Sequence, residues 1–108
     1  MKAMLKKSQA QEPFSFTFKS DEGKALVKSE NYTAKKSALN GIESVKKNCS
    51  DPDRFVKKET ASGKFRFSLT AKNHQVIGTS QNYESESGCD NGMKSVAKNA
   101  PDAKVVEE

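Results

Sequence analysis

The sequence predicts an α+β domain made of two tandem β-β-β-α repeats. One observation is that NGIESVKKN, Asn40–Asn48, recurs 51 residues later as NGMKSVAKN, Asn91–Asn99. The others are period-2 stretches, typical of strands, and period-3.6 stripes, typical of helices, at matching places in both copies. We therefore expect one domain over 1–108, with repeats at about 3–49 and 54–100 and a short C-terminal tail. The repeats should be related by pseudo-twofold symmetry, with an antiparallel sheet packed against two helices.

Each repeat begins with three predicted strands. A shift of 51 residues aligns the copies without a gap, and pairs Met4–Lys7 with Phe55–Lys58 as the first strand. The second strand alternates apolar and polar residues, with Phe14, Phe16 and Phe18 matched by Phe65, Phe67 and Leu69. The third strands are Ala25–Ser29 and Val76–Ser80. The short turns between the strands favour antiparallel hairpins.

A helix closes each repeat. Its apolar stripes are Ala34, Ala38, Ile42, Val45 and Cys49 in the first copy and Ser85, Cys89, Met93, Val96 and Ala100 in the second. Thr33 and Ser85 are the expected N-caps. Gly41 and Gly92 interrupt both helices at the same place, which indicates a close approach of another element. After the second helix, Val105 and Val106 favour one last strand.

The composition predicts a folded, reduced, cytoplasmic protein. Hydrophobic content is 33% and charged content 31%, but the apolar residues fall at periodic positions. Cys49 aligns with Ala100 and Cys89 with Ala38, so each cysteine should be a small core residue rather than half of a disulfide. No CxxC or Cys/His spacing predicts a metal site, and no stretch resembles a signal peptide or membrane span.

Two motifs resemble the YegP-like family of small bacterial proteins. They are the pattern NYxxxxxxxNGxxSVxKN, which both copies follow, and KNHQVIGTSQNY at Lys72–Tyr83. The resemblance covers about Met4 to Ala100. It implies a two-repeat α+β domain with a sheet packed on two helices. It implies no activity, because the family is a domain of unknown function without established catalytic residues.

Several residues that carry chemistry have simpler structural interpretations. The Phe rows resemble base-stacking platforms, but alternating strands normally bury their apolar face, so we expect them in the core. His74, the single histidine, fits a positive-φ position of a tight turn and has no predicted catalytic partner. Tyr32 and Tyr83 precede the helices, where each ring should cover the core edge while its hydroxyl reaches water.

The first repeat carries the candidate binding residues. Residues 1–50 hold ten Lys against five acids, whereas residues 51–108 are balanced. Lys35 and Lys36 fall in the first turn of a helix, where exposed N–H groups favour anions. With Lys28, Lys46 and Lys47 they form a candidate anion-binding face; the simpler interpretation is a solvated Lys-rich surface. Leu39, which aligns with Asp90, is a candidate for the edge of a self-association patch.

These features predict a non-enzymatic binding or interaction module with no cofactor. No Ser/His/Asp or Cys/His arrangement, ligand cluster or Gly-rich phosphate loop predicts an enzyme. The alternative is weak, sequence-independent binding of nucleic acid or another polyanion through the first repeat. A homodimer formed through a sheet edge or the Leu39 side is the third possibility.

Overall fold

The structure, a computed structural model that describes residues 1–107, confirms the α+β class. One seven-stranded sheet has the order β4-β5-β6-β3-β2-β1-β7, and two helices pack against it. The strands are β1 (Lys2–Lys7), β2 (Phe14–Lys19), β3 (Ala25–Ser29), β4 (Phe55–Glu59), β5 (Phe65–Thr70), β6 (Val76–Thr79) and β7 (Lys104–Glu107). The helices are α1 (Lys35–Asn48) and α2 (Glu86–Asn99), followed by the 3-10 turns η1 (Pro52–Arg54) and η2 (Ala100–Asp102).

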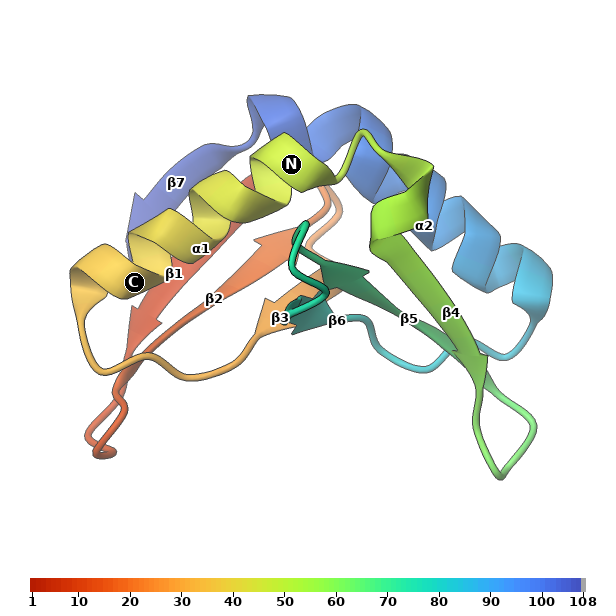
Figure 1. The fold of residues 1–108 in the computed structure, drawn as a ribbon, viewed down its shortest axis with the longest axis horizontal. Helices are drawn as coiled ribbons and strands as arrows, with labels where there is room; N and C mark the ends of the chain where they lie inside the picture. The colour runs from red at the N-terminus through yellow and green to blue at the C-terminus, as the bar shows by residue number, and fades with distance from the viewer. Residues whose placement is uncertain (108) are drawn as a thin grey trace.

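Figure 1 shows the molecule as an arch, with α1 and α2 across its top and β3 beside β6 at its centre. The loops after β1 and β4 point to opposite lower corners, and β7 and β4 lie on opposite sides. All neighbouring strands pair antiparallel except β7, which runs parallel to β1. The predicted last strand therefore forms, but it departs from the expected all-antiparallel sheet.

The core lies between the helices and one face of the sheet. Phe16, Phe18 and Phe67 are fully buried, as the alternation predicts. The helix stripes are also confirmed, except at their first positions, Ala34 and Ser85, which are exposed, and at Met93, which is half-buried. Both cysteines are free and fully buried, so their expected role as small core residues is confirmed.

The predicted gapless alignment of Met4–Lys7 with Phe55–Lys58 is wrong, because the two strands are offset by one residue in the structure. Lys7 pairs with Phe14 in the first repeat, whereas Glu59 pairs with Phe65 in the second. The loop after β1 is therefore one residue longer than the loop after β4. A shift of one residue moves a side chain to the other face of a strand. The counterpart of Leu5 is thus Lys57, and Val56 corresponds to Met4.

The two helices begin differently. Ser85 caps α2 as predicted, since its Oγ accepts a 3.0 Å hydrogen bond from the N–H of Gly88. The N-cap of α1 is Ala34, not Thr33, and no side chain accepts from its first N–H groups. The sequence places a capping residue one position too early, because the chain stays extended through Ala34.

A tyrosine ring packs closely against each of the two helical glycines, Gly41 and Gly92. A Cβ on Gly41 would lie 2.7 Å from the hydroxyl oxygen of Tyr32, and one on Gly92 would lie 2.8 Å from Cζ of Tyr83. Both rings stack on core phenylalanines. The Tyr83 hydroxyl is buried and has no hydrogen-bond partner among the described residues. The expectation that it reaches water is wrong, because α2 lies directly over it.

Candidate functional site

The helices cover one face of the sheet and leave the other open. Directly paired residues share a face, so the strand registers identify the uncovered side chains. We call this surface the open face. Leaving aside Ala25, Thr70 and Val76, whose pairings lie beyond register shifts, its members are Lys2, Met4, Lys6, Ser15, Thr17, Lys19, Lys28, Val56, Lys58, Arg66, Ser68, Thr79, Lys104 and Val106. None of these fourteen residues is buried, whereas residues that alternate with them along β1, β2 and β5, such as Leu5, Phe16 and Phe67, are buried.

The open face carries charge of one sign. Seven of its residues are Lys or Arg, and none of its strand positions holds Asp or Glu. The other twelve Lys and Arg residues are outnumbered by the fourteen Asp and Glu residues of the whole chain. The formal charge of +5 therefore arises entirely from this face. Such a one-signed surface attracts polyanions over distances of about 10 Å at moderate salt.

Like charges lie directly opposite one another on this face. Lys2 pairs with Lys19 on one side and with Lys104 on the other, so three lysines form a row across β2, β1 and β7. Lys58 and Arg66 oppose each other in the same way. Directly opposed like charges destabilise a sheet. Within residues 1–107 none of these five cations forms an ion pair.

The remaining open-face side chains are small or polar. Ser15, Thr17, Ser68 and Thr79 offer hydroxyl groups between the cations, and Lys28 lies between Thr17 and Thr79 at the centre. No aromatic residue occupies the face, because the phenylalanines turn toward the helices. The base-stacking interpretation of the Phe rows is therefore wrong. The surface matches phosphate groups, not exposed bases.

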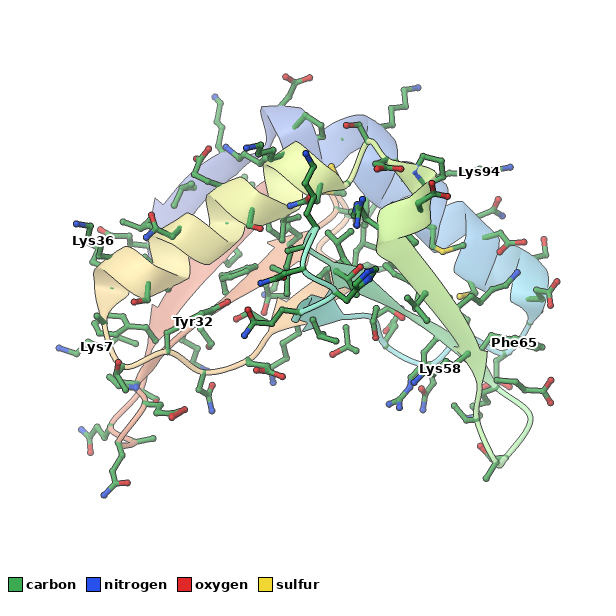
Figure 2. The ribbon with its side chains drawn as sticks, in the orientation of Figure 1. Lys7, Tyr32, Lys36, Lys58, Phe65 and Lys94 are labelled. Carbon is green, nitrogen blue, oxygen red and sulfur yellow. The ribbon has the colours of Figure 1, made fainter. Side chains whose placement is uncertain are left out.

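The five lysines singled out by the sequence do not form one cluster, because Lys28 lies on β3 and the other four lie on α1. Lys35 and Lys36 lie in the first turn of α1, and Lys46 and Lys47 lie in its last turn. The two pairs are offset by eleven positions, which corresponds to about 16 Å along the helix axis. Lys35 also forms an ion pair with Glu107 of β7, which partly neutralises it. In Figure 2, Lys36 projects outward from α1, whereas Lys58 lies beneath the arch.

The other chemical candidates have structural roles. His74 adopts φ 66° in the turn after β5, as predicted. Burial raises the pKa of the Cys49 and Cys89 thiols, which disfavours the reactive thiolates. Between residues 1 and 107, no three His, Cys, Asp or Glu side chains gather closely enough to hold a metal ion. Over the same residues, no helix is both long and apolar enough to cross a membrane.

Comparison with known proteins identifies the family. The model of a domain of unknown function, DUF1508, matches residues 10–55 and again residues 61–107. The chain belongs to the DUF1508 family. The two matches confirm the internal repeat, and the resemblance to YegP-like proteins is confirmed as well.

DUF1508 relatives match nearly the whole chain. A UPF0339 protein encoded in the 5′ region of the ptx operon of Stutzerimonas stutzeri is 52% identical over 94 residues, 87% of this chain and 85% of that protein. YegP of Escherichia coli K12 is 41% identical over 94 residues, 87% of this chain and 86% of YegP. These relatives are uncharacterised, so their names assign no activity.

Solved structures of DUF1508 relatives show the same fold. The solution structure of a UPF0339 protein from Shewanella oneidensis has a TM-score of 0.91 and 40% identity, and the match covers 98% of this chain and 89% of that one. The solution structure of YegP from E. coli also has a TM-score of 0.91, with 38% identity and coverage of 99% and 91%.

The open face is not predicted from the sequence because its residues are scattered along the chain. The signal was present in the residues that alternate with the apolar ones, such as Arg66 between Phe65 and Phe67. These positions can be recognised as one surface only when the strand order is known. In that order β7 lies beside β1, which brings Lys104 next to Lys2. Only the folded DUF1508 domain shows that neighbourhood.

Proposed function

We propose that this DUF1508 protein is a non-enzymatic, cytoplasmic binding module that holds nucleic acid by its phosphates, without reading sequence. The observation that supports the proposal best is the row Lys19–Lys2–Lys104, three adjacent cations with no carboxylate between them. A bound phosphate relieves the repulsion within this row. Binding therefore gains energy both from the new contacts and from the removal of a cost in the free protein.

The dimensions of the face suit an extended ligand. Seven strands about 4.8 Å apart span roughly 29 Å from β7 to β4, which is wider than a nucleic-acid duplex. Cations lie at both ends and at the centre, where Lys28 is located. Six of the seven cations are Lys, which lacks the planar fork with which Arg reads base edges, so binding should depend on backbone charge.

Both repeats contribute, and we take them to be related by an approximate twofold axis. The first repeat supplies Lys2, Lys6, Lys19 and Lys28, and the second supplies Lys58 and Arg66. Lys6 and Lys58 are counterparts under the corrected register. The excess in the first repeat agrees with the sequence-based alternative, although the surface lies on the sheet and not on α1.

A salt titration tests the proposal. The affinity of the protein for a fluorescently labelled 20-base-pair DNA duplex of arbitrary sequence is measured by anisotropy between 20 and 200 mM NaCl. The logarithm of the affinity should fall linearly with the logarithm of salt concentration, with a slope of magnitude up to about 6 for seven contacts. A scrambled duplex should bind equally well. Absence of binding at 20 mM NaCl, or affinity independent of salt, would contradict the proposal.

A further inference from the structure

The two edges of the sheet are not equivalent. In the first repeat β7 adds to the outer edge of β1, with Val105 opposite Ala3 and Glu107 opposite Leu5. In the second repeat β4 corresponds to β1, and no strand within residues 1–107 covers its outer edge. An uncovered edge strand presents free N–H and C=O groups that an extended chain can pair with.

An apolar groove lies beside this free edge. Its volume is about 410 Å³, and its lining combines Cys49, Pro52, Phe55, Met93 and Ala97 with the polar Ser50 and the charged Asp90 and Lys94. Phe55 is the counterpart of Ala3, whose partner on β7 is Val105. The groove therefore occupies, in the second repeat, the position that the Val105 side chain takes in the first. Figure 2 shows Lys94 projecting from α2 at this side of the molecule.

The charged residues beside the next position along the β4 edge differ from those at the equivalent position of β1. In the first repeat Glu107 of the added strand forms an ion pair with Lys35 of α1. The counterpart of Lys35 on α2 is Glu86, and the counterpart of Leu39 is Asp90. Both carboxylates share one cation, Lys57, at 3.4 and 2.9 Å. A strand added to β4 would therefore lie beside two carboxylates and one lysine, which together carry a net negative charge. The equivalent residue of β7, Glu107, instead lies beside the positive charge of Lys35.

We propose that the outer edge of β4 is a docking site for an extended peptide of another protein, with the pattern apolar-apolar-basic, added parallel to β4. The first apolar residue lies opposite Phe55 and enters the groove. The second lies opposite Val56, whose side chain is 40% exposed and whose counterpart Met4 pairs with Val106. The basic residue lies opposite Lys57 and contacts Glu86, because Lys57 neutralises only one of the two carboxylates, Glu86 and Asp90, that it contacts.

A second copy of this chain fits the site less well. Its own added strand reads Lys-Val-Val-Glu, so its glutamate would face Glu86 and Asp90. The proposed partner has the same apolar pair but the opposite terminal charge.

Two matched peptides test the proposal. Acetyl-Thr-Val-Val-Lys-Thr-amide and its Lys→Glu counterpart are titrated to millimolar concentration into the full chain, and backbone amide shifts and hydrogen exchange are recorded by NMR. The lysine peptide should bind about fivefold more tightly than the glutamate peptide. Shifts should concentrate in β4 and the groove, and amides of Phe55–Glu59 should gain protection.

A substitution in the groove tests whether the peptide binds beside β4. Ala97→Lys places in the groove the residue that α1 carries at the same position, Lys46, and should weaken the lysine peptide severalfold. Lys98→Ala, a neighbouring exposed change, should leave binding unchanged. No binding at millimolar concentration would overturn the proposal. Equal affinity of the two peptides, shifts confined to β7 or the open face, or protection of β4 that grows with protein concentration alone would also overturn it.

Discussion

Lys58 of β4 lies directly across from Arg66 of β5 on the open face, and neither forms an ion pair with a described residue. Opposed like charges of this kind destabilise a sheet by a few tenths of a kcal/mol to about 1 kcal/mol. The presence of both cations therefore lowers the free energy of unfolding. The proposed function gives a reason, since the same two charges attract phosphate.

Replacing one of these cations should separate stability from binding. Arg66→Glu turns the repulsive pair into an attractive one, so the free energy of unfolding should rise by about 0.5 to 1 kcal/mol. Affinity for nucleic acid should fall at the same time. Urea denaturation measures the first effect and anisotropy the second. Lys72→Glu, in an exposed turn, makes the same charge change and should leave stability nearly unchanged. A less stable Arg66→Glu protein would contradict this interpretation.

The buried hydroxyl of Tyr83 predicts a stabilising substitution. This oxygen has no hydrogen-bond partner within residues 1–107, and an unsatisfied buried polar group costs about 1–3 kcal/mol. Tyr83→Phe keeps the ring stacked on Phe67 and removes the unpaired group. The free energy of unfolding should therefore increase by about 1 kcal/mol. Thermal unfolding checks the change, and a clear loss of stability would show that the hydroxyl is satisfied in solution.

Gly92 should tolerate no side chain while Tyr83 is present. A Cβ there would lie 2.8 Å from Cζ of the tyrosine. Gly92→Ala gains helix propensity of about 1 kcal/mol, but overpacking typically costs 1–3 kcal/mol, so the variant should be less stable. Combining it with Tyr83→Phe should restore part of the loss. Gly88→Ala serves as the control in the same helix, because its nearest neighbour is a serine hydroxyl at 3.3 Å.

The missing cap of α1 offers another test. Ala34→Asp supplies an acceptor for the free N–H groups and a negative charge beside Lys35 and Lys36. The free energy of unfolding should rise by about 1 kcal/mol. Ser85→Ala, which removes the cap of α2, should lower it by a similar amount. Chemical denaturation of the two variants should thus give shifts of opposite sign, and shifts of the same sign would contradict the cap assignment.

Alkaline pH should weaken the fold. Burial raises the pKa of Cys49 and Cys89, and also of Tyr32 and Tyr83, above the values in the unfolded chain. Above about pH 8.5 the unfolded chain therefore binds fewer protons than the folded one, and the free energy of unfolding decreases as pH rises. Below the unfolded pKa values this contribution is complete. Urea midpoints between pH 7 and 11 measure the decrease.

The cysteines can be separated from the tyrosines in that series. Replacing both thiols with alanine, the residue that each aligns with in the other repeat, should flatten the decrease between about pH 8 and pH 10. The remaining decrease at higher pH should persist, because the tyrosines are unchanged. A double variant whose midpoint falls as steeply as the parent's over the lower range would exclude the thiols as its cause.

The sequence predicted the parts of the fold that depend on local pattern. Alternation placed Phe16, Phe18 and Phe67 in the core, and helical spacing identified the buried faces of α1 and α2. It did not predict the register of β4, because Lys57 and Lys58 are both charged and nothing in the repeat marks which one faces α2. The ion pairs from Lys57 to Glu86 and Asp90 make that distinction in the folded chain.

The candidate site was only partly accessible from the sequence. Runs such as Lys35–Lys36 and Lys46–Lys47 stand out in the printed chain, but they lie at opposite ends of the 14-residue helix α1. Lys2, Lys19 and Lys104 do not stand out, because three different strands carry them. Their adjacency depends on long-range pairing, above all on the parallel addition of β7 to β1. Local patterns contain no information about that pairing.

The most direct test compares two double charge reversals in one duplex-binding measurement. Lys28→Glu/Arg66→Glu alters the open face, and Lys36→Glu/Lys47→Glu alters exposed positions at the two ends of α1. Each lowers the formal net charge from +5 to +1. We predict that the first reduces affinity at least tenfold at 50 mM NaCl and lowers the salt slope by about 2, whereas the second changes affinity less than threefold. Equal losses, or a larger loss from the α1 variant, would contradict the assignment of the open face.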